Sequence, residues 1–496
     1  MAGPVLFLGV LWGVPAGADL SAAGHRVLAL AALMAWWWIT EAIPVPATAL
    51  LPLALLPVLG VQPVREVAAS YGDSNIFLFM GGFFLAVTMQ RWGLHRRLAL
   101  HVIRLIGSNP RTLVLGFMVA TAALSMWISN TATTLMMYPI ALALVLHLDE
   151  GSAPEDARAR ARLKTALMLG VAYAASIGGI GTLIGTPPNI ILVAQLTRLF
   201  PKAPTIGFLD WLKVGLPFVA LFLPLSWLLL TRVVLPLGKQ GLGGGRQAVR
   251  QEIERLGRPS RGEWLVGLVF VLTALAWVWR SDVELGAVHI PGWASLLGLG
   301  AKVNDATVAM VAAVLLFVVP VDFRRREFLL DWETARGIPW GVLLLFGGGI
   351  ALAGAFESSG LAAWVGHRLS LLRSLPPLVL VSLVCLVTTF VTEVTSNTAV
   401  ASIFTPVLGA TAVAVGMHPL LLMIPSAISA SCAFMLPVAT PPNAIVFASG
   451  HVSIPQMARA GVLLNLLGVI LVTLVVYVVA VPAFGIKMGV LPTWAR

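Results

Sequence analysis

Ser129-Asn130-Thr131 and its second copy, Ser396-Asn397-Thr398, are polar triplets that each interrupt a long apolar stretch of the chain. At membrane depth, polar groups are costly unless they line a cavity, face a protein partner or bind a ligand. Each triplet is followed by a second break with a shared spelling, Thr186-Pro187-Pro188-Asn189 and Thr440-Pro441-Pro442-Asn443. Two kinds of break, one of each in either half, predict an internal repeat with a candidate site at its centre.

The second half repeats the first at a constant spacing around the triplets. Ser396 lies 267 positions after Ser129. The same spacing relates three further pairs, Gly81 and Gly348, Gly93 and Gly360, and Pro139 and Pro406. The second Thr-Pro-Pro-Asn break needs a smaller offset, because the second half lacks the charged loop that follows the first triplet. The repeat therefore covers the whole region between the Gly-Gly pairs and the triplets.

The composition is that of a membrane protein. Of the 496 residues, 58% are hydrophobic and only 11% are charged, too few for the surface of a soluble protein of this size. The net charge of +11 comes from basic residues in short loops between apolar spans, which indicates a positive-inside bias rather than nucleic-acid binding. Cys385 and Cys432 lie in apolar stretches without metal-ligand spacing and are interpreted as packing residues.

Segment lengths around the breaks predict two unusual kinds of element. Residues 113–146 are apolar on both sides of the first triplet, but each arm is too short to span a bilayer at about 1.5 Å per residue. A re-entrant hairpin with the triplet at its tip fits these lengths. Residues 166–199 are too long for one span and are interrupted by glycines and Thr-Pro-Pro-Asn, as in a discontinuous helix with an unwound middle. The repeat predicts the same pair in the second half.

Basic residues suggest how the repeats are oriented. Five Lys or Arg residues lie between the Gly-Gly pair and the triplet in the first half, but only two in the second. We therefore predict an all-α polytopic membrane protein with an inverted repeat. It would have about 11 transmembrane helices, two re-entrant hairpins and two discontinuous helices, with the N-terminus cytoplasmic and the C-terminus outside. Residues 4–18 are interpreted as a short first membrane helix; a cleaved signal peptide is the alternative.

The residue types around the triplets favour an anion held together with cations. No Lys or Arg lies within about ten residues of either triplet, and Glu393 is the only nearby carboxylate. An anion would be held by Asn amides, hydroxyls, backbone N–H groups and helix N-termini. Since neutral dipoles alone do not desolvate a dianion cheaply, bound cations would supply the missing charge. Hard oxygen ligands favour Na⁺, and the repeat predicts two equivalent Na⁺ sites beside one substrate, with no organic cofactor.

Ile39-Thr40-Glu41-Ala42-Ile43-Pro44, both triplets and both Thr-Pro-Pro-Asn breaks resemble the divalent anion/sodium symporter family over essentially the whole chain. The resemblance implies a homodimer in the lipid bilayer, in which a fixed scaffold domain holds a transport domain that moves as an elevator. The corresponding division is residues 1–106 (scaffold) and 107–262 (transport) in repeat 1, then 263–373 (scaffold) and 374–496 (transport) in repeat 2. Glu41 itself is interpreted as a helix-end group.

The resemblance also implies roles for individual residues. The substrate-binding residues would be Asn130, Thr131, Thr186, Ser396, Asn397, Thr398, Thr440 and Pro441. The first Na⁺ would be bound by Ser125, Ser129, Asn130 and the Gly185 carbonyl. The second Na⁺ would be bound by Thr392, Ser396, Asn397 and the Ala439 carbonyl. Ser125 and Thr392 obey the repeat spacing, which supports the transfer.

The sequence thus predicts a Na⁺-coupled symporter of C4-dicarboxylates such as succinate, in a bacterial-type inner membrane. A Na⁺-independent dicarboxylate exchanger and a sulfate or citrate carrier of the same fold are alternatives that the motifs do not separate. An intramembrane enzyme would need a nucleophile and a base or metal ligands at membrane depth, and Ser129 and Ser396 have no nearby histidine in sequence. A channel is less consistent with two broken helices that close on one site.

Overall fold

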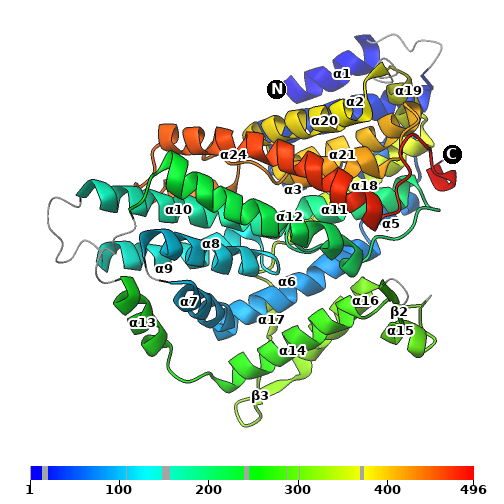
Figure 1. The fold of residues 1–496 in the computed structure, drawn as a ribbon. Coiled ribbons are helices and arrows are strands. Elements are labelled where there is room, and N and C mark those ends of the chain that lie inside the picture. Colours follow the sequence, from blue (N-terminus) through cyan, green and yellow to red (C-terminus); the bar gives the residue numbers. More distant parts are fainter. Residues whose placement is uncertain are drawn as a thin grey trace.

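The computed structural model describes residues 2–13, 20–107, 109–147, 157–238, 245–285, 288–300, 302–368 and 374–495. Most of them lie in helices that run roughly side by side (Figure 1). Within these described ranges, eight helices are long and apolar enough to cross a membrane: Ala22–Thr40, Val64–Trp92, Phe208–Val234, Arg261–Val278, Trp340–Ser358, Pro377–Val394, Asn397–Ala414 and Ile454–Ala483. Further apolar helices have 10–17 residues, fewer than the 18 residues taken as the minimum for a span. The helical membrane fold is therefore confirmed, and the number of crossings stays a prediction.

The first helices precede the first triplet. They are α1 (Ala2–Gly13), α2 (Ala22–Thr40), α3 (Val45–Thr48), α4 (Leu51–Val58), α5 (Val64–Ser70), α6 (Ser74–Trp92) and α7 (Leu94–Ile106). The segment after Pro44 is divided into α3 and α4, each of which begins with a proline in its first turn. Proline fits there because its missing N–H has no partner within a helix. The helix α7 has basic and apolar residues on different faces, as expected for a helix at the membrane surface.

The first triplet lies at the tip of a helical hairpin, as predicted. The arms are α8 (Pro110–Ser125) and α9 (Asn130–His147), so the second arm begins within the triplet. The discontinuous helix follows as α10 (Ala157–Gly179) and α11 (Pro187–Leu199), separated by an unwound segment. Next come α12 (Phe208–Leu228) with its π-helical end η2 (Leu229–Val234) and α13 (Gly245–Leu256). The polar stretch between the two halves, residues 238–263, therefore contains a helix.

The second half contains the same succession and two small additions. Its elements before the second hairpin are α14 (Arg261–Val278), β1 (Val283–Leu285), β2 (Val288–Ile290), α15 (Trp293–Leu296), α16 (Asp305–Val318), β3 (Pro320–Asp322), β4 (Glu327–Phe328), α17 (Trp332–Ala335), α18 (Trp340–Ser358) and α19 (Leu361–Arg368). The antiparallel pairs β1–β2 and β3–β4 are short connecting hairpins that the helical prediction did not include.

The second hairpin and the second discontinuous helix complete the repeat. The elements are α20 (Pro377–Val391), η4 (Thr392–Val394), α21 (Asn397–Ala414), α22 (Leu420–Ser429), α23 (Pro441–Phe447), α24 (Ile454–Val475), η5 (Val476–Ala480), α25 (Val481–Ala483) and η6 (Thr493–Ala495). The first hairpin opens toward the side where α13 lies, and the second opens toward α19 and the C-terminal residues (Figure 1). The two halves are thus inverted relative to each other.

Close helix packing repeats between the halves. Gly81 of α6 lies directly against the backbone of Ala309 in α16, and Gly348 of α18 lies against the backbone of Ala49. A Cβ atom at either glycine would overlap that backbone, so only glycine permits these two approaches. Gly81 and Gly348, which are related by the repeat, therefore both allow a neighbouring backbone to approach their helix closely.

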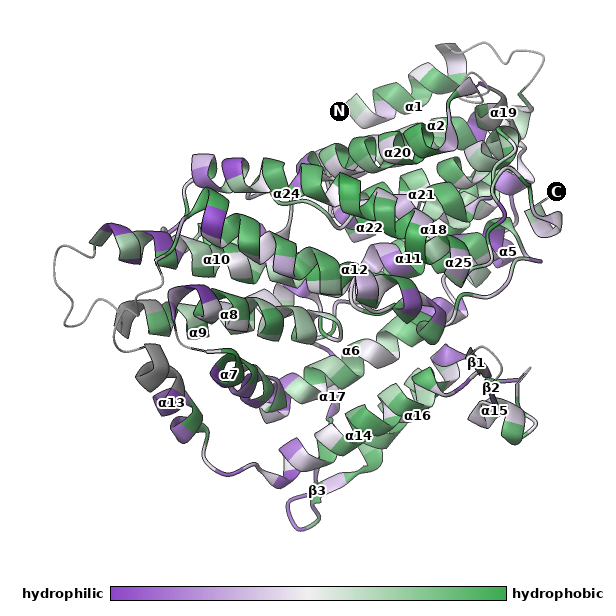
Figure 2. Cartoon of the chain, in the orientation of Figure 1, coloured by the Kyte–Doolittle hydropathy of each residue, from purple (hydrophilic) through white to green (hydrophobic). Residues whose placement is uncertain are grey.

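Most helices are hydrophobic along much of their length, whereas hydrophilic residues concentrate at helix ends and on α7 (Figure 2). The outer face of α14 and α16 exposes large apolar side chains, among them Trp264, Leu268, Leu272, Val314 and Val318. A face of this kind is stable against lipid chains or another apolar surface. A smaller buried cluster joins α2 and α4 to α18 and α19. The division into scaffold and transport parts stays a prediction.

Candidate functional site

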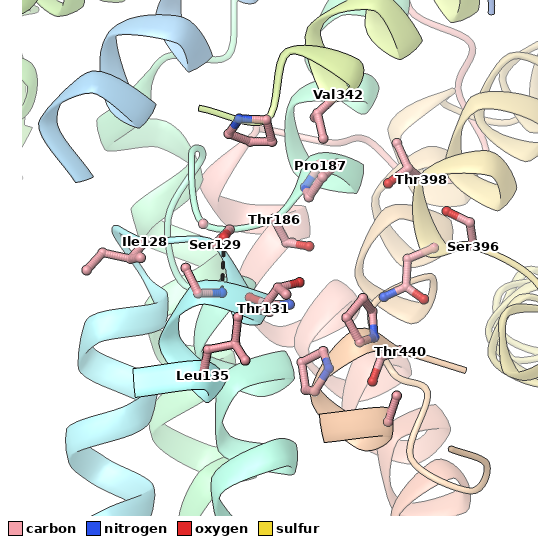
Figure 3. Close-up of a pocket in the computed structure, with 18 of the residues that line it drawn as sticks. Ile128, Ser129, Thr131, Leu135, Thr186, Pro187, Val342, Ser396, Thr398 and Thr440 are labelled. Carbon is pink, nitrogen blue, oxygen red and sulfur yellow. Dashed lines mark hydrogen bonds between the residues drawn. The ribbon is translucent and has the colours of Figure 1, made fainter. Parts of the chain in front are cut away.

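A cavity of about 960 Å³ lies where both hairpin tips and both helix breaks meet. All eight predicted substrate residues line it: Asn130, Thr131, Thr186, Ser396, Asn397, Thr398, Thr440 and Pro441. Ser129, Thr131 and Thr186 from the first half lie across the cavity from Ser396, Thr398 and Thr440 of the second (Figure 3). The fold thus brings together four segments that are far apart in the sequence.

Four helices begin at the cavity wall, which gives the site its polarity. Asn130 is the first residue of α9 and Asn397 the first residue of α21. Thr186 and Thr440 are the N-cap residues of α11 and α23, each followed by the two prolines of the break. The helix dipole places partial positive charge at all four ends. Free backbone N–H groups come mainly from the first turns of α9 and α21, because α11 and α23 each begin with two prolines, which have no N–H. These ends suit an anion.

The side chains of the cavity add almost no charge. Among the lining residues Glu41 is the only one with an ionisable side chain, and no Lys, Arg or His is among them. Glu41 is the C-cap of α2 and has a left-handed backbone with φ of 46°, which agrees with its interpretation as a helix-end group. The cavity is therefore rich in dipoles and free hydroxyls but carries no side-chain positive charge.

The predicted Na⁺ ligands divide into two positions. Ser129, Asn130, Gly185, Ser396, Asn397 and Ala439 line the cavity, whereas Ser125 and Thr392 are fully buried behind it. Ser125 Oγ lies 2.8 Å from Asn130 Oδ1 and 2.7 Å from the Ala175 carbonyl oxygen. The repeat-related Thr392 Oγ1 lies 2.7 Å from Asn397 Oδ1 and 2.9 Å from the Ala430 carbonyl oxygen.

In each half, one hydroxyl group lies beside two carbonyl oxygen atoms, so there are fewer hydroxyl protons than oxygen atoms that could accept them. A hydroxyl has one proton to donate, so Ser125 and Thr392 each satisfy one neighbouring carbonyl oxygen and leave the other without that donor. Surplus oxygen atoms at hydrogen-bond distance are the donor set that a hard cation such as Na⁺ uses. The same arrangement occurs in both halves.

Asn189 and Asn443, the last residues of the two Thr-Pro-Pro-Asn motifs, shape the helix breaks. Asn189 Nδ2 donates to the carbonyl oxygens of Gly179, Ile180 and Thr182 at 3.2, 3.3 and 2.7 Å. Asn443 Nδ2 donates to those of Ala433 and Leu436 at 3.3 and 3.0 Å. Both asparagines are fully buried. They donate to carbonyl groups that have no helical partner in the unwound segments. In the sequence, the position of each asparagine three residues after the Thr of the break indicates this role.

The cavity also has an apolar wall from the predicted scaffold. Phe79, Phe83 and Val87 of α6 line it, as do Ile338 and Val342 at the start of α18. Polar groups thus come mainly from the hairpins and breaks, while the opposite wall is largely apolar, with Thr40, Glu41 and Gln90 as its polar residues. Such a wall offers few fixed polar partners that would have to be broken if the two parts moved past each other.

The two hairpins differ in how their second arms, α9 and α21, contact the preceding helices α7 and α19. Ile403 and Val407 of α21 pack in the same apolar cluster as Ala362 and Val365 of α19. In the first half, α9 and α7 stand at the corresponding places, and a cavity of about 350 Å³ lies between them, lined also by Leu124 of α8 and Glu252 of α13. Residues lining that second cavity include His95, Arg96, Met136, Pro139, Ile140 and Ala143. Thus α21 packs against α19 in the second half, whereas a cavity lies between the repeat-related helices α9 and α7 in the first half.

Comparisons with known proteins give consistent results. Residues 2–484 match the model of the sodium:sulfate symporter transmembrane region. The chain is 44% identical over 475 residues to the sodium-dependent dicarboxylate transporter SdcS of Staphylococcus saprophyticus, with 95% of this chain and 89% of that protein covered. It is also 44% identical over 490 residues to SdcS of Staphylococcus aureus (strain bovine RF122), with coverage of 98% and 92%.

One solved structure has a similar fold. The Alcanivorax borkumensis YdaH transporter, whose crystal structure is described as having an unusual topology, aligns with a TM-score of 0.56. The alignment covers 92% of this chain and 98% of that one at 15% sequence identity. At this identity the similarity concerns the fold alone.

Proposed function

Because this chain belongs to the sodium:sulfate symporter family, the divalent anion/sodium symporters that its motifs resemble, we propose that it is a Na⁺-coupled symporter of C4-dicarboxylates such as succinate. One observation carries the proposal: the cavity combines helix N-termini and neutral polar side chains with no lining Lys, Arg or His in the described part of the chain. The relatives named sodium-dependent dicarboxylate transporters support it.

The need for Na⁺ follows from this charge distribution. Removing an ion from water costs several kcal/mol even after relaxation of the protein, and a dicarboxylate carries two such charges. Partial charges at helix ends offset part of that cost. Two Na⁺ ions in the surplus oxygen groups at Ser125 and Thr392 would balance the two negative charges of the dicarboxylate. The cavity would then bind substrate well only when Na⁺ is bound.

A two-carboxylate substrate suits the two-fold arrangement of the site. Asn130 and Thr131 begin one hairpin arm, while Asn397 and Thr398 begin the other. Each pair would bind one carboxylate, and Thr186 and Thr440 would add hydroxyls from the helix breaks. Competition against labelled succinate by fumarate, malate, citrate and sulfate tests this substrate class. We expect fumarate and malate to compete, and preferential competition by sulfate or citrate would contradict the dicarboxylate assignment.

Loss of the buried hydroxyls should weaken Na⁺ binding. We expect Ser125→Ala and Thr392→Val each to raise the Na⁺ concentration for half-maximal uptake about tenfold, since one ligand interaction contributes about 1.4 kcal/mol. Na⁺ titration of uptake measures the effect. Thr121→Ala is the matched control, because Thr121 is buried on the same helix but bonds only to the Phe117 carbonyl. Unchanged Na⁺ dependence in both site variants would contradict the Na⁺ ligand assignment.

Transport would proceed by alternating access in an elevator-type movement, with a homodimer of scaffolds in the plasma membrane. The apolar wall of the cavity and the unequal contacts of the two hairpins support the elevator-type movement. By the inverted repeat, the opposite state would close α9 onto α7 and separate α21 from α19. The N-terminus would lie in the cytoplasm and the C-terminus outside. A carrier of this kind has no catalytic task, and we assign no enzymatic activity.

Filling the cavity between α7 and α9 should slow this movement. We expect Ala143→Trp to lower the maximal uptake rate about tenfold, because overpacking costs about 1–3 kcal/mol in the state that closes the cavity. Half-saturation for Na⁺ and succinate should change less than about twofold. Kinetics of uptake at matched protein levels measures both. A normal maximal rate would show that α9 does not close onto α7.

A further inference from the structure

Glu393 is a buried carboxylate at the tip of the second hairpin, with 3% of its surface exposed. Its Oε1 accepts hydrogen bonds from the backbone N–H groups of Phe434 and Met435 at 2.6 and 2.9 Å and from Asn465 Nδ2 at 2.7 Å. Its Oε2 accepts from the N–H of Leu436 at 3.1 Å. These donors are all neutral amides, so four hydrogen bonds, none of them from a cationic group, hold the carboxyl group in place.

The carboxylate connects two parts of the proposed second Na⁺ site. On one side it follows Thr392, whose hydroxyl lies against Asn397 Oδ1. On the other side it fixes the N–H of Leu436, and the carbonyl of Leu436 accepts from the N–H of Ala439 at 3.2 Å. The proposed ligands Thr392 and the Ala439 carbonyl are thus held relative to each other through Glu393.

The first half has no such charge. Met126 lies 267 positions before Glu393, and its carbonyl accepts a hydrogen bond from Thr182 Oγ1. The unwound segment there is held by neutral groups, with Asn189 and Trp211 donating to its carbonyls.

The partner of Glu393 is also absent from the first half. Gly215 of α12 and Gly461 of α24 each lie against the unwound segment of their own half. Four positions after these glycines stand Val219 and Asn465 respectively. The charged carboxylate and its amide donor are therefore confined to the second half of an otherwise two-fold site.

We propose that Glu393 is a positioning residue that makes the Na⁺ site of the second half the tighter of the two, so that this site is occupied first. The proposal rests on the Na⁺-coupled function argued above. A fixed negative charge in a poorly solvated interior attracts a nearby cation more strongly than the same charge in water. Rigid placement of the Thr392 and Ala439 ligands acts in the same direction, since a preorganised site loses less entropy on binding.

Charge removal at Glu393 tests the proposal. In Glu393→Gln, the Na⁺ concentration for half-maximal succinate uptake should rise about tenfold, which equals about 1.4 kcal/mol. The maximal rate and the succinate half-saturation at saturating Na⁺ should change less than about twofold. A merely structural role would lower the maximal rate and leave the Na⁺ dependence unchanged. Monodisperse elution of the purified variant establishes that it is folded.

Asn465→Val is the matched control. It introduces the residue type found in the first half and removes one hydrogen bond while keeping the Glu393 charge. Its Na⁺ half-saturation should stay within about twofold of the unmodified protein. An equal loss of Na⁺ affinity in Asn465→Val and Glu393→Gln would overturn the charge argument, because packing alone would then explain both.

A double-mutant cycle identifies which Na⁺ site Glu393 serves. The effects of Glu393→Gln and Ser396→Ala should be non-additive, and those of Glu393→Gln and Ser129→Ala additive. The reverse pattern would overturn the proposal. If the unmodified protein takes up succinate without Na⁺, the proposed function fails; if its uptake requires Na⁺ and Glu393→Gln leaves the Na⁺ titration unchanged, only the proposal about Glu393 fails.

Discussion

Alanine at Asn130 or at Asn397 is expected to reduce Na⁺-driven succinate uptake at least about 100-fold and to leave the protein folded. Each asparagine begins a hairpin arm at the cavity, and its Oδ1 lies next to a buried hydroxyl of the proposed Na⁺ site. Each variant would lose a substrate contact and a Na⁺ ligand together. Two interactions of about 1.5 kcal/mol each correspond to a factor of about 100 or more.

Uptake into proteoliposomes at matched protein levels measures this loss, and monodisperse elution establishes folding. Asn304→Ala is a suitable control, because Asn304 caps α16 in a connecting segment and does not line the cavity. That variant should retain most of the uptake. Full uptake by Asn130→Ala or by Asn397→Ala would show that the cavity described here is not the substrate site.

Leucine at Asn189 or Asn443 is expected to abolish uptake and also to lower the melting temperature. Each variant leaves two or three buried carbonyl groups of an unwound segment without their donor. A buried unsatisfied polar group costs about 1–3 kcal/mol, so the break would lose its shape and the proposed Gly185 or Ala439 ligand its position. The combination of both effects distinguishes these variants from those at Asn130 and Asn397.

Thermal unfolding in detergent and uptake by the same preparations test this prediction. Thr197→Val on α11 is the control on the same discontinuous helix, because the Thr197 hydroxyl bonds only to a carbonyl of its own helix and is exposed. It should melt and transport like the unmodified protein. An Asn189→Leu or Asn443→Leu variant with normal stability and uptake would show that the asparagines do not support the breaks.

The sequence predicted the hairpins and the breaks because each leaves a strong local pattern. Ser129-Asn130-Thr131 interrupts apolar residues at a length too short for a span, and Pro187 and Pro188 mark where α11 begins. By contrast, α13 lies in a mostly polar stretch whose apolar residues at helical spacing, Val249, Ile253 and Leu256, are few, and the strands of the β1–β2 hairpin have only three residues each. These elements depend on contacts with distant segments, such as the pairing of Arg96 on α7 with Glu252 on α13, and local patterns do not reveal such contacts.

The candidate site shows the same distinction between local and distant information. Repeat spacing related Ser125 to Thr392, and the structure gives their hydroxyls matching neighbours in the two halves. The environment of Glu393 was beyond sequence reasoning, because its donors at Phe434 and Asn465 lie far along the chain. Equivalent Na⁺ sites were expected from the repeat, whereas this carboxylate occurs in one half only.

A requirement for Na⁺ follows from the absence of Lys, Arg and His among the described residues that line the cavity. Its most direct test is uptake of radiolabelled succinate into proteoliposomes, either with an inward Na⁺ gradient or with K⁺ replacing Na⁺ on both sides. We predict rapid uptake with Na⁺ and none above protein-free liposomes with K⁺. Equal uptake in K⁺, driven by dicarboxylate inside the vesicles, would contradict the claim and identify a Na⁺-independent exchanger.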